Sequence, residues 1–159
     1  MKLLGFLSKD AVALGMKSVG KEDAIRELIQ VLVDQGELGA EKLEPVLASV
    51  LEREAIGSTG LGDGIAIPHV KDCEHITGLT GVFGRSDSEA GIAFEAIDGK
   101  PVHLMFLILG GPETSDEHIQ VLRKLAALRL NEHFLRFLKG AEGKEQVIET
   151  IQEMAGSIA

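Results

Sequence analysis

The sequence has no tryptophan or tyrosine, and its 159 residues include only six phenylalanines. Aromatic rings provide the stacking surfaces that single-stranded nucleic acids and many sugars favour. Basic residues are also in the minority, with 16 lysines and arginines against 25 aspartates and glutamates, so the formal net charge is −9. A field of this sign repels phosphate backbones. We therefore expect neither a nucleic-acid partner nor direct sugar binding.

Cysteine is nearly absent as well, and the one that is present, Cys73, cannot form an internal disulfide. This composition suits a reducing compartment. No apolar run approaches the roughly 20 residues that span a bilayer, which argues against membrane insertion. The opening MKLLGFLSKDAV is apolar only briefly, and it lacks the hydrophobic region and the cleavage site of a secretory signal. We therefore expect a cytoplasmic protein.

The chain does contain enough apolar sequence for one folded domain. Hydrophobic residues make up 45% of it and charged residues 26%, as in an ordinary globular protein. Its length suits one domain with a substantial core. We predict a single domain over residues 1–159, without internal repeats, linkers or low-complexity stretches.

Two segments in the N-terminal third repeat their apolar residues at helical spacing. The first, 22–35, has acidic residues in its first turn and Gly36 just past its end. The second, 41–54, contains Pro45, which a helix tolerates in or near its first turn. Both segments are predicted to be amphipathic helices.

The middle of the chain changes to short apolar runs separated by turn residues. These runs predict four strands, at 65–67, 79–84, 92–94 and 102–109. The last run is apolar on both alternations, which is typical of a central strand covered on both faces. The helical period then returns, and three further helices are expected to begin near Ser115, Asn131 and Lys144. This order predicts an α/β fold in which a mixed central sheet is sandwiched between helices, a three-layer α/β/α arrangement.

The stretch GDGIAIPHV, at 62–70, is the most informative for chemistry, because a short apolar run ends at Pro68 and delivers His69. Proline fixes φ and has no N–H, so it stops the strand and sets the direction in which His69 leaves it. The glycines upstream interleave with Ser58, Thr59 and Asp63, which permits sharp turns and a close approach of backbone N–H groups to an anion. The pattern favours a held, solvent-facing imidazole; an ordinary surface loop before a buried strand fits it equally well.

Two more residues are candidates for the same chemistry. His118 falls in the first turn of the helix that begins near Ser115, where free N–H groups favour an anion and disfavour imidazolium. A neutral imidazole there could donate a hydrogen bond to a phosphoryl oxygen or to another histidine; alternatively, Asp116 and Glu117 beside it simply serve the helix cap. Arg53 lies at the mouth of the glycine-rich loop, and its planar donor fork suits phosphate, although an exposed arginine at a helix end is usually a solvated charge.

The remaining histidines and the cysteine carry weaker arguments. His103 is interpreted as a hydrogen-bonded residue of the core or its rim, and His75 and His133 as surface residues. The H-x3-C-E-H spacing at 69–75 matches no familiar zinc pattern. There is no G-x-S-x-G elbow, and Cys73 lacks a recognisable thiol-enzyme motif. We therefore expect no metal, no other cofactor and no serine or thiol nucleophile.

The segment 61–69, LGDGIAIPH, follows LEREAIGSTG at 51–60. Together they resemble the phosphorylation motif of enzyme IIA of the bacterial phosphoenolpyruvate-dependent phosphotransferase system. The resemblance is to the fructose and mannitol class, which includes the nitrogen-regulatory branch, and it covers nearly the whole chain. KEDAIRELIQVLVDQG resembles the opening helix of the family, GKPVHLMFLILGGP its central strand, and DEHIQVLRKLA the helix with its second active-site histidine. The family fold is a mixed sheet flanked by helices, which agrees with the pattern of the sequence.

The resemblance implies a role for three residues. His69 matches the histidine that accepts a phosphoryl group from the small histidine-containing phosphocarrier protein and passes it to an enzyme IIB partner, typically onto a cysteine there. His118 matches the assisting histidine, and Arg53 matches the active-site arginine. A neutral imidazole, with a pKa of about 6.5, is nucleophilic at cellular pH. Such a transfer needs no metal and no nucleotide.

One position departs from the family, which often has glycine or alanine after the Pro-His pair. Here Val70 follows, and a β-branched residue restricts the backbone next to the transferred group. Two roles stay open for a member of this class: sugar uptake of the fructose or mannitol type through an IIB partner, or a regulatory role in which phosphorylation of His69 controls binding to target proteins. A third, a histidine-dependent hydrolase, lacks a triad or a metal set.

Overall fold

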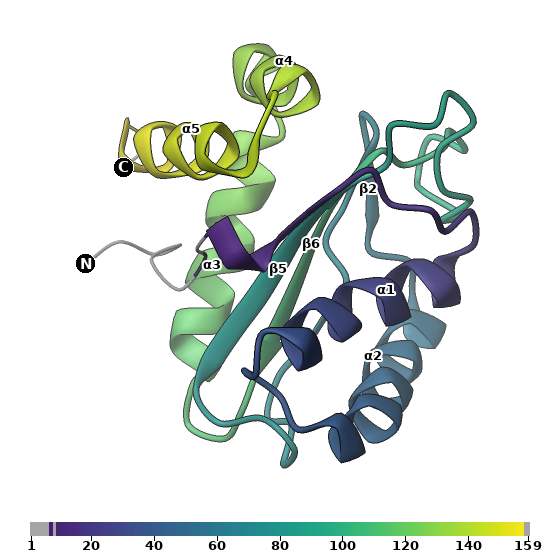
Figure 1. Cartoon of the computed structure of the whole chain (residues 1–159), viewed down its shortest axis with the longest axis vertical. Coiled ribbons are helices and arrows are strands. Elements are labelled where there is room, and N and C mark those ends of the chain that lie inside the picture. Colours follow the sequence, from purple (N-terminus) through teal and green to yellow (C-terminus); the bar gives the residue numbers. More distant parts are fainter. Residues whose placement is uncertain (1–6, 8, 158–159) are drawn as a thin grey trace.

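Two long strands form the centre of the molecule. β5 (Leu79–Arg85) and β6 (Leu104–Gly110) pair antiparallel along their full length. The computed structural model describes residue 7 and residues 9–157. Within that part of the chain the strands form one six-stranded sheet in the order β1-β5-β6-β3-β2, and β4 also pairs with β6 (Figure 1).

Four short strands extend this pair, and most of them run parallel to their neighbour. β1 (Val12–Leu14) is parallel to β5. β3 (Ile65–Ala66) and β4 (His69–Val70) are both parallel to β6, while β2 (Gly60–Gly62) is antiparallel to β3. The sheet is therefore mixed, as the sequence predicts.

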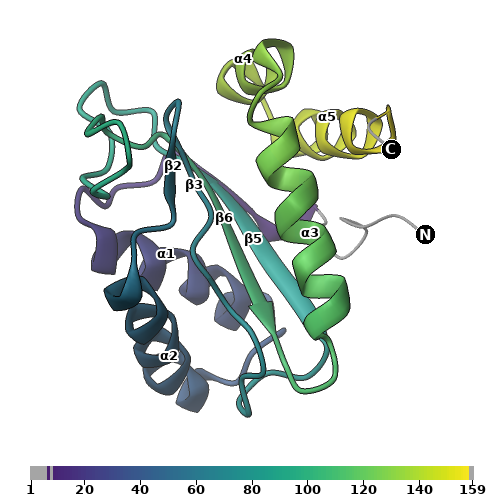
Figure 2. The same ribbon diagram turned by 180° about the vertical axis from the view of Figure 1, so that it is seen from behind.

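The side chains of β6 alternate between two separate apolar clusters, and every residue of the strand is buried. One cluster includes α1 (Lys21–Asp34) and α2 (Leu43–Ile56), and it receives Met105, Leu107 and Leu109. The other includes α3 (Ser115–Leu128), α4 (Glu132–Gly140) and α5 (Lys144–Ser157), and it receives Leu104, Phe106 and Ile108. The views in Figures 1 and 2 show the sheet between these two groups of helices. The predicted three-layer α/β/α arrangement is confirmed.

The five predicted helices are all present. α2 follows a short 3-10 turn at Ala40–Lys42, which includes the start predicted for this helix. α4 begins where expected because the Asn131 side chain accepts hydrogen bonds from the N–H groups of His133 and Phe134. Among the residues described, none of the helices is long and apolar enough to cross a membrane.

The strand predicted at 92–94 is wrong. Ile92 bridges Val102, and Ala93 bridges Gly20, but both are isolated bridges and no ladder forms. Ile92 and Phe94 are nevertheless fully buried. An apolar run reports burial, and a packed loop between β5 and β6 produces the same signal as a buried strand. For the same reason the strand predicted at 102–109 begins later, at the start of β6.

Candidate functional site

The predicted site residues meet at the carboxyl end of β6. His69, in β4, pairs with Ile108, close to the point where β6 ends. The chain then turns into α3, which carries His118, while Arg53 reaches the same place from the last turn of α2. A cleft of about 590 Å³ opens there, and all three side chains line it. The carboxyl ends of the strands in an open α/β sheet are the usual place for a ligand site.

The imidazole of His69 is half-buried and held by the backbone. Its Nδ1 lies 2.8 Å from the carbonyl oxygen of Ile67. A carbonyl can only accept, so this contact assigns the proton to Nδ1 and leaves the lone pair on Nε2. Between these two residues, the carbonyl of Pro68 accepts the N–H of Ile108 at 3.0 Å, which ties the turn to the central strand. The ring therefore has a fixed support and a defined nucleophilic nitrogen.

The surroundings of His69 lower its pKa below the ordinary histidine value. Burial is the main cause, and the positive charges of Arg53 and Lys71 add to it. The hydrogen bond to Ile67 and the negative charge of Glu54 act in the opposite direction. Because burial and positive neighbours both disfavour imidazolium, the ring is neutral near pH 7.

His118 is completely buried, with 0% of its surface exposed. Neither of its ring nitrogens has a hydrogen-bond partner among the described residues. Loss of solvation lowers the pKa of His118 to about 4, with further contributions from the charges of His69 and Lys71, while Asp72 opposes the shift. The side chain is thus a neutral imidazole with an uncommitted N–H at the wall of the cleft. Buried polar groups are seldom left unpaired, so such a group needs an explanation.

A glycine makes room for that ring. A Cβ at Gly110, the last residue of β6, would lie 2.7 Å from Nδ1 of His118 and 3.0 Å from Oγ1 of Thr114. Real Cβ atoms essentially never approach a neighbour as closely as the first of these distances. The end of the strand and the start of α3 can therefore pack closely only because residue 110 has no side chain.

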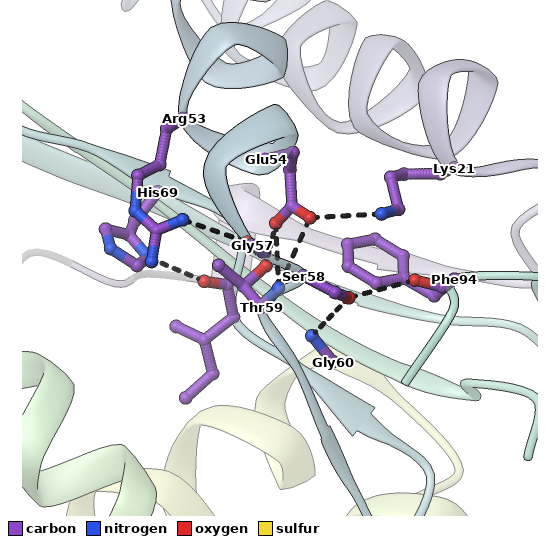
Figure 3. A network of polar contacts seen from close by, with 10 residues as sticks. Lys21, Arg53, Glu54, Gly57, Ser58, Thr59, Gly60, His69 and Phe94 are labelled. Atoms are coloured by element: carbon purple, nitrogen blue, oxygen red, sulfur yellow. Dashed lines mark hydrogen bonds and ion pairs between the residues drawn. The ribbon is translucent and has the colours of Figure 1, made fainter. Parts of the chain in front are cut away.

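Arg53 contributes a positive charge that acts on His69. Its Nη1 donates to the carbonyl oxygen of Gly57 at 2.9 Å, and Figure 3 shows the guanidinium beside the ring of His69. That bond uses one of the five N–H donors of a guanidinium. A neutral nucleophile, a guanidinium and a buried imidazole thus share one cleft. The set is chemically suited to a phosphoryl group, which offers three anionic oxygens around an electrophilic phosphorus.

Several other predictions concern single residues, some at this cleft and one at the opposite end of β6. Val70 lies half-buried in β4 opposite Leu109, so its β-branched side chain occupies a strand position, which suits it. His75, expected simply at the surface, is half-buried and lines the cleft. His103 is half-buried near the start of β6. Its backbone N–H donates to the carbonyl oxygen of Gly64 at 2.8 Å, in keeping with a rim residue. Within the described ranges, no three histidine, cysteine, aspartate or glutamate side chains are grouped to hold a metal ion.

Glu54, a buried residue next to the site, is not predicted from the sequence. Its carboxylate contacts Lys21 and Thr59, at the loop that leads to β2. A signal was available, because Glu54 continues the stripe of buried positions that includes Leu47 and Val50 in α2. A charged residue at such a position is almost never fully buried unless it is paired.

Comparison with known proteins gives a consistent result. The family described as "Phosphoenolpyruvate-dependent sugar phosphotransferase system, EIIA 2" matches residues 5–154. The fructose-specific EIIA component of Haloferax volcanii is 34% identical over 145 residues, covering 91% of this chain and 91% of that protein. The nitrogen regulatory protein of Klebsiella oxytoca is 39% identical over 125 residues, covering 76% and 75% respectively. The fructose-specific EIIABC component of Bacillus subtilis is 34% identical over 96% of this chain, which spans only 23% of that longer protein.

Solved structures show the same relationship. Nitrogen regulatory protein IIA-Ntr from Neisseria meningitidis superimposes with a TM-score of 0.82 at 31% identity, covering 92% of this chain and 97% of that one. A complex of enzyme IIAMtl with phosphorylated enzyme IIBMtl from Escherichia coli contains a chain that matches with a TM-score of 0.72 at 26% identity, covering 91% and 96%. This protein therefore belongs to the EIIA type 2 family of the phosphoenolpyruvate-dependent sugar phosphotransferase system.

Proposed function

We propose that this chain is a phosphocarrier and that it carries the phosphoryl group on Nε2 of His69. The observation with the most weight is the 2.8 Å contact between Nδ1 of His69 and the carbonyl of Ile67, because it leaves Nε2 with its lone pair. Membership of the EIIA family supports phosphoryl transfer in general. The low pKa of His69 keeps that lone pair available at neutral pH.

The proposed transfer conserves every proton on His69. The lone pair of Nε2 attacks the phosphorus of the phosphohistidine on the histidine-containing phosphocarrier protein. The new P–Nε2 bond forms as the P–N bond of the donor breaks, and the donor nitrogen keeps that electron pair. The proton on Nδ1 stays in its hydrogen bond to Ile67 throughout. No step needs a metal or a nucleotide.

The second step is transfer from His69 to an enzyme IIB protein. A thiolate of the acceptor cysteine attacks the phosphorus, and Nε2 recovers its lone pair as the P–N bond breaks. An acceptor of this kind is supported by the similarity to enzyme IIAMtl, which has been solved together with phosphorylated enzyme IIBMtl.

In this proposal Arg53 and His118 bind the phosphoryl oxygens. The guanidinium provides donors and positive charge, and the buried imidazole of His118 provides one N–H that has no other partner among the described residues. Because His118 is already neutral and buried before the reaction, it needs little reorganisation to stabilise the transition state. Its burial also removes water from one side of the transferred group.

The direct test is phosphorylation from phosphoenolpyruvate with enzyme I and the histidine-containing phosphocarrier protein. The expected product is a phosphoryl adduct that is labile in acid and stable in base, located at His69. His69→Ala should remove it, while His133→Ala, an exposed histidine on α4, should retain it. Labelling that survives in His69→Ala would show that the phosphoryl group is carried elsewhere.

A regulatory role is the second candidate, in which the phosphorylation state of His69 controls binding to target proteins. It is favoured by the 39% identity to the nitrogen regulatory protein of Klebsiella oxytoca and by the TM-score of 0.82 to IIA-Ntr. The two roles separate experimentally. The phosphorylated chain is offered to a panel of fructose- and mannitol-type IIB domains: rapid transfer supports sugar uptake, and transfer to none of them supports regulation.

A further inference from the structure

Glu54 is a buried carboxylate beside the candidate site, with its side chain 3% exposed. A carboxylate in such a place is costly unless donors surround it. Three donors do so here. Lys21 Nζ lies 3.2 Å from Oε2, the backbone N–H of Thr59 lies 3.2 Å from both carboxylate oxygens, and the Thr59 hydroxyl donates to Oε1. Glu54 therefore fixes Thr59 through both its backbone and its side chain.

From Thr59 the contacts continue to the imidazole of His69. The carbonyl of Thr59 accepts the N–H of Ile67 at 3.0 Å. The carbonyl of Ile67 in turn accepts the Nδ1 proton of His69 at 2.8 Å. Two residues thus connect the buried carboxylate to the histidine, and Figure 3 shows Glu54, Thr59 and His69 in one close-up of this network.

The other side of the loop is also anchored, so the network is held from both directions. The hydroxyl of Ser58 donates to the carbonyl of Phe94 at 3.1 Å and accepts the N–H of Gly60 at 3.1 Å. Lys21, the ion-pair partner of Glu54, lies 4.8 Å from the centre of the Phe94 ring. The loop that follows α2 therefore has little freedom to shift relative to His69.

We propose that Glu54 is a positioning residue, which holds Thr59 so that the Ile67 carbonyl keeps the proton of His69 on Nδ1. The tautomer of a histidine is set by the hydrogen bond that its other nitrogen makes. Without a fixed acceptor next to Nδ1, the proton moves to Nε2, and the ring then presents no lone pair to the phosphoryl donor. The kinetic consequence rests on the function proposed above, whereas the tautomer is a property of the unphosphorylated chain.

The test measures the tautomer directly, by long-range proton–nitrogen NMR of the whole chain with ¹⁵N-labelled histidine. The unmodified chain should show His69 with its proton on Nδ1. Glu54→Gln replaces one acceptor oxygen by an amide donor, and Thr59→Val removes the hydroxyl at nearly constant shape. Both should increase the Nε2–H population of His69 severalfold and slow its phosphorylation on the order of tenfold to a hundredfold.

Two variants serve as matched controls. Glu44→Gln makes the same change on α2 at an exposed carboxylate, which pairs with Arg26, and it should alter neither the tautomer nor the rate. Thr59→Ser keeps the hydroxyl, so the His69 tautomer and the phosphorylation rate should remain those of the unmodified chain. If Glu54→Gln does not fold, the pair Thr59→Val and Thr59→Ser still decides the question.

A purely structural role for Glu54 would lower stability without moving the proton of His69. Unchanged tautomer populations in folded Glu54→Gln and Thr59→Val would therefore overturn the inference. Failure of the proposed function looks different: the unmodified chain takes up no phosphoryl group, while the tautomer still shifts in the two variants, and that result would support the positioning role.

Discussion

The rings of His69 and His118 lie 5.5 Å apart between their centroids, tilted by 56°, although one belongs to β4 and the other to α3. The His69 ring is tied to a backbone carbonyl, while the His118 ring has no hydrogen-bond partner in the described part of the chain. At this separation a charge on one ring disfavours a charge on the other, and burial disfavours both. The pair is therefore neutral near pH 7, where one ring offers a lone pair and the other an N–H.

The buried state of His118 predicts how stability depends on pH. Its pKa is about 4 in the folded chain, against the ordinary value of 6.5. Between these two pH values the unfolded chain therefore binds more protons than the folded chain. The contribution of His118 to the free energy of unfolding is complete above pH 6.5 and is lost as the pH falls towards about 4. The loss from this group is on the order of 3 kcal/mol.

Denaturant titrations of the unmodified chain and of His118→Gln, at pH 7 and at about pH 4.5, measure this loss. Many carboxylates titrate over the same range, so the difference between the two proteins isolates the contribution of His118. The unmodified chain should lose more stability than the variant on acidification. Equal losses, or an NMR titration of His118 near its ordinary pKa, would contradict the assignment.

Gly110 should not tolerate even alanine, because a Cβ there would lie 2.7 Å from Nδ1 of His118. The ring is fully buried, so the strand end, the helix start or the ring itself must shift. We expect Gly110→Ala to destabilise the chain by about 1–3 kcal/mol and to slow phosphorylation of His69.

A second glycine provides the matched control. Gly140 ends α4, and a Cβ at that position would meet nothing within 4 Å. Gly140→Ala should stabilise the chain by up to about 1 kcal/mol through helix propensity, with no effect on phosphorylation. Denaturant titration and the phosphorylation rate of both variants check the pair; similar behaviour of the two would show that the room beside His118 is unimportant.

Local signals in the sequence predict the position of His69, but they do not predict how the residues around it pack. Pro68 and the glycines act within a few residues of His69, and Asn131 marks the start of α4 by capping it directly. The burial of His118 depends on contact between two elements, and that contact requires Gly110, whose role no periodicity reports. Glu54 shows the same limit, since its helical position indicates burial but not the partners that make burial possible.

Arg53 should influence both the rate of transfer and the proton affinity of His69. Its positive charge lowers the pKa of His69, so Arg53→Gln should raise that pKa towards the ordinary histidine value. In the proposed mechanism the same variant also removes guanidinium donors from the phosphoryl oxygens, so phosphorylation should slow by roughly a hundredfold or more. NMR titration of His69 and single-turnover phosphorylation measure the two effects.

Arg26→Gln is a suitable control for the loss of an arginine, because Arg26 lies on α1 in an ion pair with Glu44 and does not line the cleft. It should leave both the pKa of His69 and the rate unchanged. A normal rate for Arg53→Gln would remove the arginine from the proposed mechanism, even if the pKa of His69 moved as expected.

The apolar rim of the cleft should contribute to partner binding. Ile56, the last residue of α2, lines the cleft although 82% of its surface is exposed. Ile119 is also exposed and also lines the cleft. Exposed apolar side chains beside a cleft are typical of a surface that a protein partner covers. Ile56→Ser should raise the KM for the histidine-containing phosphocarrier protein by roughly five- to thirtyfold, as expected for about 1–2 kcal/mol of lost contact, with kcat nearly unchanged. Ile97→Ser is the matched control, because Ile97 is 80% exposed but does not line the cleft; equal effects of the two substitutions would place the docking surface elsewhere.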